Sequence, residues 1–284
     1  EVTRRLQPNA AISVCGPDVR WCGNEAGQTR PEEWSVVPIE LQDLEKIAEH
    51  SQQIDDGKFS RKLTSGDEDL GSRQALENYQ GELVWFPAEV NTSIRPGWFY
   101  HPEEDNQVRN VDELYQMYLK TVGGNSTFLL NIPPNKAGMI HENDLDVLNQ
   151  LAEKIQQVKD QTVIKQAKLD VSSAVSEIQL NDLLSDEMPF WQSQIDDQTP
   201  WIEVFWENDQ LLHRIILKEA IQVSQRVEAF TVYYEEVGEY KIATKGTMIG
   251  YQKILEFAPI QTKRIRVVFD AFRGRPAITK INFN

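Results

Sequence analysis

The sequence contains little cysteine, histidine or methionine: two, four and four residues among 284. Cys15 and Cys22 form neither a CxxC motif nor a usual set of metal ligands. Two thiols also leave the redox compartment undecided. These shortages exclude a disulfide-stapled scaffold and a cysteine–histidine metal site, so we expect no metal and no cofactor.

Basic residues are also scarce. Lysine and arginine number 29 against 44 aspartates and glutamates, which gives a formal net charge of -15. A nucleic-acid partner is therefore not expected, because binding phosphates requires a basic surface. No apolar run approaches the ~20 residues that cross a bilayer, and no signal peptide opens the chain, so we expect no membrane partner. An acidic surface of this kind suits a neutral ligand.

The first part of the chain repeats a strand, a long loop and a helix. Apolar runs of strand length lie at 10–15, 83–86 and 126–132, and helical spacing is present at 39–53, 111–122 and 142–156, with a shorter helix expected from Ser72. Asn110 with Glu113 is typical of a helix start. This alternation predicts a parallel α/β structure. A (β/α)8 barrel needs roughly 200–250 residues, so residues 1–161 are interpreted as the C-terminal part of such a barrel.

The second part of the chain has a different composition and hydrophobic pattern. Runs such as "VEAFTVYYEEV" and "KRIRVVFDAF" are short, rich in β-branched and aromatic residues, and separated by turns. No helical period is present in them. The pattern predicts an antiparallel β-sandwich over residues 162–284. The fold class expected for the whole chain is therefore α/β plus all-β.

One carboxylate stands out in "VCGPDVRWCGNEAGQTRPEEW". Glu25 follows a predicted strand and lies between Gly23 and Gly27, with Trp21 and Trp34 nearby in sequence. An apolar wall such as an indole disfavours a charged carboxyl group and suits a general acid. The alternative is a solvated loop glutamate, in a chain that contains many of them.

A second candidate is the aromatic stretch "SIRPGWFYH". Arg95 precedes a Pro-Gly turn that presents Trp98, Phe99 and Tyr100 near the end of a predicted strand. Aromatic faces pack on the C–H groups of sugars, and an arginine can hydrogen-bond sugar hydroxyls. Three consecutive side chains cannot all face one pocket, so Phe99 and Tyr100 are expected to belong to the core.

Other motifs argue against alternative chemistries. His101, His141 and Glu142 do not have HExxH or paired-ligand spacing, so they do not indicate a metal site. The glycines of "GGNSTFLLNIPP" precede a strand and lack the Lys-Ser/Thr of a phosphate-binding loop. A nucleotide site is not expected.

Several long motifs occur in the order found in one enzyme family. "GPDVRWCGNEAG", "LGSRQAL" and "WFPAEVNTSIRPGWFYHPEEDNQVRN" resemble the α-L-fucosidases of glycoside hydrolase family 29. The similarity is greater to the branch that prefers α-1,3/1,4-linked fucose, and it runs from about residue 9 to 155. The later stretches "GTMIGYQKIL" and "RIRVVFDAFRGRPAITKI" resemble the C-terminal sandwich of these enzymes, a domain of the discoidin or carbohydrate-binding type.

This resemblance implies a retaining exo-α-L-fucosidase that works by double displacement on fucosylated glycans. It implies that Glu25 is the acid/base and that Trp98 packs on the fucose ring. From their own chemistry and position, Trp21 and Arg95 are also expected to bind substrate. The family's aspartate nucleophile comes from an earlier barrel strand. Asp18 is not assigned that role, because its "GPDVRW" context matches the segment leading to the acid/base.

Two hypotheses therefore remain open from the sequence. In the first, an upstream barrel half, in the same protein or a separate chain, supplies the nucleophile, and this chain alone is inactive. In the second, the chain is a non-catalytic carbohydrate-binding or scaffold protein built on a degenerate barrel fragment. An extracellular or periplasmic location is implied by the resemblance alone.

Overall fold

The computed structural model describes residues 2–13, 16–30, 32–42, 70–160, 163–177, 183 and 189–284. This part of the chain forms two compact units. The first comprises residues 1–121 and 126–150, and the second comprises residues 122–125 and 151–284. The boundary that we placed between two domains at residue 161 from the sequence remains a prediction.

The first unit is built on a parallel sheet whose strand order is β1-β4-β5. Its elements are α1 (Val2–Leu6), β1 (Arg20–Trp21), β2 (Val36–Pro38), η1 (Ile39–Gln42), β3 (Leu83–Trp85), β4 (Ala88–Ser93), η3 (Pro102–Glu104), α3 (Val111–Thr121), β5 (Ser126–Asn131) and the start of α4 (Glu142–Asp160). Arg20 pairs with Ala88, and Ala88 in turn pairs with Ser126. The carboxyl ends of the three strands therefore meet at one edge of the sheet.

The central strand β4 is a correction to the sequence analysis. The parallel strand that we expected at residues 83–86, before Pro87, does not form there. Residues 83–85 instead pair antiparallel with β2, and the parallel strand begins after the proline. Every residue of β4 is buried, including Glu89, Asn91 and Ser93. Their polarity hid the strand, because a buried parallel strand usually reads as an apolar run.

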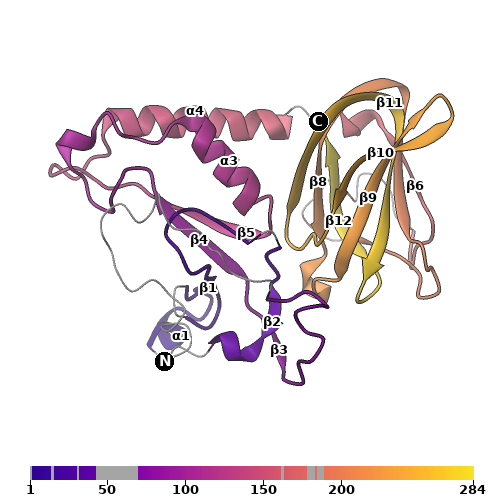
Figure 1. Ribbon diagram of the computed structural model, residues 1–284, viewed down its shortest axis with the longest axis horizontal. Helices are drawn as coiled ribbons and strands as arrows, with labels where there is room; N and C mark the ends of the chain where they lie inside the picture. The colour runs from indigo at the N-terminus through magenta and orange to yellow at the C-terminus, as the bar shows by residue number, and fades with distance from the viewer. Residues whose placement is uncertain are drawn as a thin grey trace. The chain divides into compact units, whose positions relative to one another are not determined.

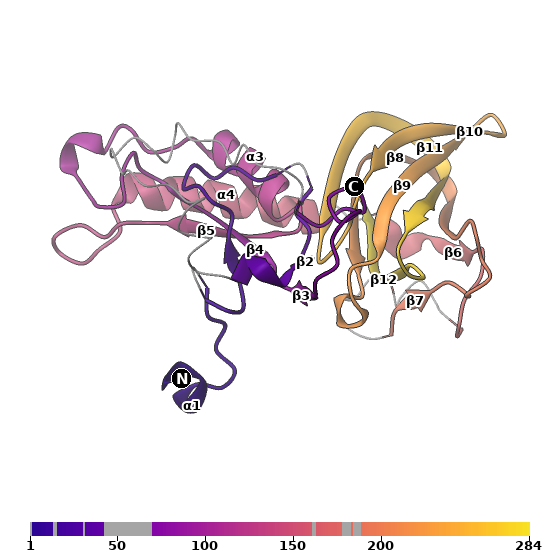
Figure 2. The same ribbon diagram turned by 60° about the horizontal axis from the view of Figure 1, so that its bottom comes forward.

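Helix α3 and the start of α4 lie on one side of this sheet (Figures 1 and 2). The predicted cap of α3 is present, because the Asn110 side-chain oxygen accepts a hydrogen bond from the Glu113 backbone N–H at 2.8 Å. The spacing of apolar residues in α4 predicts an inward face formed by Leu145, Leu148, Ala152 and Ile155, and the observed face differs. Asp144 and Leu151 are buried on it, whereas Leu145 is 44% exposed.

Four further predictions of elements meet different outcomes. Residues 10–13 are not a strand, and the expected strand's last two positions lie outside the described residues. Only Ile39–Gln42 of the helix expected at 39–53 is described, as a 3-10 turn. The segment after Ser72 forms turns, starting with a bond from the Leu76 N–H to the Ser72 carbonyl. The strand β5 forms as expected but is not buried on both faces, since Leu129 is 49% exposed.

The second unit is dominated by one antiparallel sheet of order β10-β9-β11-β8-β12-β7, with β6 also pairing with β8. Its elements are the end of α4, η4 (Ile164–Gln166), β6 (Lys168–Val171), β7 (Trp191–Gln192), β8 (Trp201–Glu219), η6 (Ile221–Val223), β9 (Val227–Glu236), β10 (Glu239–Gly246), β11 (Lys253–Phe272) and β12 (Ala277–Phe283). The antiparallel pairing agrees with the class of sheet predicted for the C-terminal part.

Strands β8 and β11 are long enough to belong to two layers of this sheet. Their mutual pairing shifts register twice, between Glu256 and Ile260 and between Thr262 and Arg264. Pro259 lies in the first shift, where a strand residue without an N–H is tolerated. On one side of the shifts the pair is flanked by β6 and β9, and on the other side by β12. The result is a sandwich-like fold.

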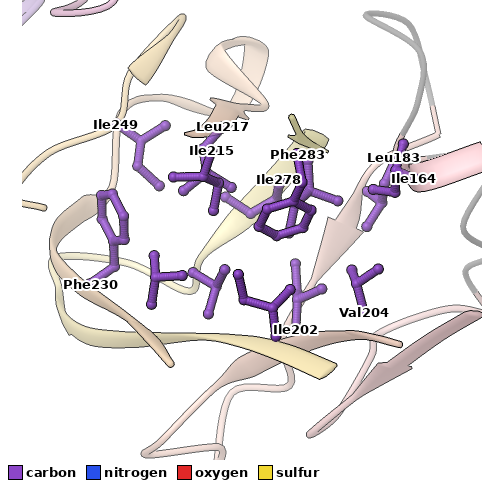
Figure 3. Close-up of a cluster of buried hydrophobic side chains, with 14 of the residues drawn as sticks. Ile164, Leu183, Ile202, Val204, Ile215, Leu217, Phe230, Ile249, Ile278 and Phe283 are labelled. Atoms are coloured by element: carbon purple, nitrogen blue, oxygen red, sulfur yellow. The ribbon is translucent and has the colours of Figure 1, made fainter. Parts of the chain in front are cut away.

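Alternating residues of the two layers form the core. Figure 3 shows Ile202 and Val204 of β8 facing Ile215, Ile278 and Phe283 across the interior, and all five are at most 1% exposed. Burying side chains of this size contributes about 1.5–3 kcal/mol each. The alternation of apolar and polar residues that predicted strands from the sequence is therefore what fills this core.

A buried carboxyl group in this unit gives a pH-dependent prediction. Glu219 accepts backbone N–H bonds from Arg226, Val227 and Gly250 at 2.7–2.9 Å. Burial outweighs these bonds and raises the pKa of Glu219 from 4.5 to about 7. The folded state therefore holds a proton that the unfolded state releases between these pH values. We expect the free energy of unfolding to fall by about 3 kcal/mol from this group as pH rises from 4.5 to 7.

The Glu219→Gln variant isolates this contribution because it removes the titration and leaves other carboxyl groups in place. Urea unfolding at several pH values should show the wild-type protein losing stability relative to the variant as pH rises. A difference between the two proteins that stays constant from pH 4.5 to 7 would contradict the assignment.

Candidate active site

The loop after β1 is organised by the side chain of Asn24. Its amide oxygen accepts the Ala26 N–H at 2.9 Å, and its amide nitrogen donates to the Gln28 carbonyl at 3.2 Å. Gly23 and Gly27 have φ values of 97° and 75°, which residues with a side chain rarely adopt. The "GNEAG" pattern therefore forms a tight turn that projects Glu25.

This loop is fixed along β4. The Cys22 N–H donates to the Glu89 carbonyl at 3.0 Å, and the Gly27 N–H donates to the Asn91 carbonyl at 3.2 Å. The Trp21 indole N–H donates to the Asn91 side-chain oxygen at 2.9 Å. Asn91 therefore holds both ends of the turn that carries Glu25.

Glu25 meets a tryptophan from a different loop. The Trp98 indole N–H donates to Glu25 Oε2 at 2.8 Å, and both residues are half-buried. Asn131, at the end of β5, donates its side-chain amide to the Trp98 carbonyl at 3.1 Å and to the Ser93 hydroxyl at 3.0 Å. Side chains that follow β1 and β4 are thus joined to the end of β5, where the carboxyl ends of the three strands meet.

Arg95 lies in a buried ion-pair network. Its side chain is 0% exposed, and its Nε donates to both Asp144 oxygens at 2.9 and 3.1 Å. Asp105 pairs with it at 3.0 Å, and its guanidinium lies 4.6 Å from the centre of the Tyr100 ring. Burial lowers the pKa of Arg95, but the two carboxylates outweigh burial and raise it. The structure therefore gives Arg95 carboxylate partners in place of the exposed face that a sugar ligand requires.

The other tryptophans near Glu25 in sequence are placed differently. Trp21 is half-buried and uses its N–H on Asn91, and also on the Asn24 carbonyl at 3.1 Å. Trp34 is 1% exposed, and its carbonyl accepts a bond from buried Arg20 at 2.7 Å. The indole N–H of Trp98 donates to Glu25, whereas that of Trp21 donates to Asn91 and Asn24.

Asp18 belongs to a separate contact. One of its oxygens pairs with Arg4 and the other accepts the Ile12 N–H at 2.7 Å. This backbone hydrogen bond and the arginine lower the pKa of Asp18. Both carboxylate oxygens are thereby engaged at the start of the segment that leads to Glu25.

A sequence model of the family described as alpha-L-fucosidase matches residues 11–159, which include the whole of this site. The chain belongs to the α-L-fucosidase family. It is similar to Alpha-L-fucosidase 1 of Arabidopsis thaliana, with 28% identity over 97% of this chain and 51% of that protein.

Solved structures with a similar fold also include proteins named as α-L-fucosidases. A protein from Bacteroides ovatus named "putative alpha-L-fucosidase" has a TM-score of 0.76 and 32% identity over 99% of this chain and 43% of its own. A protein of the same name from Bacteroides thetaiotaomicron has a TM-score of 0.80 and 25% identity, over 99% and 59%. This α-L-fucosidase family member thus spans about half the length of the curated relatives it matches.

Several residues of the site escaped the sequence analysis. Asn24, Asn91 and Asn131 position the loop and the tryptophan, yet asparagine is common in turns and gave no separate signal. The available clue was the polar composition of residues 89–93 between two apolar stretches. Polar side chains on a fully buried strand must have partners, and such a strand therefore points toward a site.

The described residues lack two kinds of feature. No group of three or more histidine, cysteine, aspartate or glutamate side chains is arranged to hold a metal ion within them. In the same part of the chain, no helix is long and apolar enough to cross a membrane.

Proposed function

We propose that this fucosidase-family chain carries the acid/base part of a retaining exo-α-L-fucosidase. Glu25 protonates the leaving glycosidic oxygen and then activates the water that releases fucose. The observation that supports this role is the contact between Glu25 and Trp98 at the carboxyl edge of a parallel sheet. Such an edge is where barrel enzymes place their catalytic groups. The substrate class is terminal α-1,3/1,4-linked fucose on oligosaccharides or glycoconjugates.

The three parallel strands fit the last part of a (β/α)8 barrel. β5 lies at an edge of the sheet, and its Leu129 is 49% exposed, which is unusual for a strand of a closed barrel. The chain also covers only about half of its curated relatives. We infer that further strands complete the barrel in the active enzyme, in the same protein or a separate chain, and that this chain alone releases no fucose.

The nucleophile in this proposal is an aspartate outside residues 1–284. Retaining glycosidases place the two carboxyl groups about 5–5.5 Å apart, so that aspartate should approach Glu25 to this distance. Asp18 is a poor alternative, because Arg4 and the Ile12 N–H already hold its oxygens. Trp98 and Trp21 are proposed to contact the sugar, and Arg95 is proposed to support the loop instead. An extracellular or periplasmic location remains a proposal that follows from the family.

The nucleophile can be identified by covalent labelling. The complete protein that contains this chain should be treated with 2-deoxy-2-fluoro-fucosyl fluoride, which leaves a slowly hydrolysed sugar on the nucleophile of a retaining enzyme. Peptide mass spectrometry should find the label on an aspartate outside residues 1–284. A label on Asp18 or on another residue of this chain would overturn the assignment. Absence of both label and fucose release would favour a non-catalytic carbohydrate-binding protein.

A further inference from the structure

We propose that Trp98 is a positioning residue that sets the direction of the Glu25 carboxyl group through its indole N–H. This inference rests on the proposed function of Glu25 as acid/base. It goes beyond a sugar-stacking role, because stacking needs only the ring face, whereas the structure shows the N–H used on Glu25 at 2.8 Å.

A glutamate side chain rotates about several bonds, so its carboxyl group must be oriented before it can act on a substrate. Glu25 projects from a turn between two glycines that the side chain of Asn24 organises. A general acid must lie within about 2.6–3.2 Å of the oxygen that it protonates. A charge-assisted hydrogen bond from an indole restricts the carboxyl group to one orientation. The Trp98 indole therefore places a directional restraint on the carboxyl group of Glu25 from a different loop.

Trp98 is suited to this task because it is itself fixed. Its carbonyl accepts the side-chain amide of Asn131, which also donates to Ser93 at the end of β4. Three residues earlier, Arg95 is fully buried between Asp105 and Asp144. The loop that carries Trp98 is thus attached to β4, to β5 and to the start of α4.

The two functions of the tryptophan can be separated by Trp98→Phe, which keeps an aromatic face and removes the N–H. The test uses kcat/KM in the complete protein, because this quantity reports steps up to formation of the fucosyl-enzyme. A disaccharide needs protonation of its leaving group, whereas a 2,4-dinitrophenyl fucoside does not. We expect kcat/KM for the disaccharide to fall about 10- to 100-fold, as a misplaced catalytic group does, and kcat/KM for the aryl fucoside to change less than about 3-fold.

A second variant and a matched control complete the experiment. Asn131→Ala should reproduce the same selective loss at smaller size, and it carries the test if Trp98→Phe does not fold. Trp85→Phe makes the same substitution at an indole that is 40% exposed on β3 and should change neither value. The inhibition constant of fucose should stay within about 3-fold in Trp98→Phe, because the ring face remains.

The outcomes separate the inference from the function on which it rests. Equal loss on both substrates would show a structural or sugar-binding role for Trp98, and no loss on either would show that the N–H is dispensable; both results overturn the inference. Glu25→Gln is measured in parallel. If it lowers kcat/KM for the disaccharide while Trp98→Phe does not, only the inference fails. If Glu25→Gln has no effect, the proposed function itself fails.

Discussion

Replacing Glu25 by alanine or glutamine in the complete enzyme should reduce turnover of natural fucosides by about 10²- to 10⁴-fold. This is the usual contribution of a general acid–base group. The fold should survive, because Asn24 and Asn91 hold the turn. Initial rates on an α-1,3/1,4-fucosylated oligosaccharide measure the effect.

A surface glutamate provides the control for this result. Glu82→Ala changes an exposed side chain that precedes β3, and turnover should stay within about 2-fold of the wild-type value. Circular dichroism should be the same for both variants and the wild type. If Glu25→Ala retains wild-type turnover, Glu25 takes no part in the mechanism.

Arg95→Met should destabilise the protein by about 3–5 kcal/mol. The substitution keeps an unbranched apolar stem but leaves the Asp144 carboxylate, which is 0% exposed, without its arginine. A buried charge that loses its partner is among the most costly changes in a protein. Urea unfolding followed by tryptophan fluorescence should show the loss as a lower midpoint for the transition of the first unit.

A double variant shows whether the buried charge causes this loss. Arg95→Met combined with Asp144→Leu removes both charges and should be more stable than Arg95→Met alone, since well-packed apolar residues replace a buried pair at little cost. Arg5→Met, at an exposed position in α1, should change stability by less than about 0.5 kcal/mol. A double variant as unstable as Arg95→Met would show that lost packing, and not the Asp144 charge, explains the effect.

The elements that the sequence predicted well are those with regular spacing and local signals. α3 has its cap at Asn110, and the C-terminal strands alternate apolar and polar residues. The Glu25 loop was visible because glycines bound it on both sides. In each case residues close in sequence determine the structure.

The parts that could not be predicted depend on partners distant in sequence. β4 was not predicted because the hydrogen-bond partners of its buried polar residues lie far away in the sequence. Trp21, for example, donates to Asn91, which is 70 residues later. Arg95 looked like a sugar ligand because nothing near it in sequence reveals Asp144, 49 residues later. The same pair explains why Asp144, a charged residue, lies on the inward face of α4. The contact between Trp98 and Glu25 joins two motifs that were each noticed but could not be connected by spacing alone.

Azide rescue of the Glu25→Ala variant tests the assignment of Glu25 as the acid/base of a retaining enzyme. The complete protein carrying this substitution should be given an activated aryl α-fucoside with and without sodium azide. Azide needs no general base, so it can attack the fucosyl-enzyme that water hydrolyses only slowly when the base is absent. A faster reaction with azide is therefore expected, and proton NMR should identify the product as fucosyl azide with the α configuration of the substrate. No acceleration by azide, or a β-fucosyl azide, would contradict the assignment of Glu25 as the acid/base of a retaining enzyme.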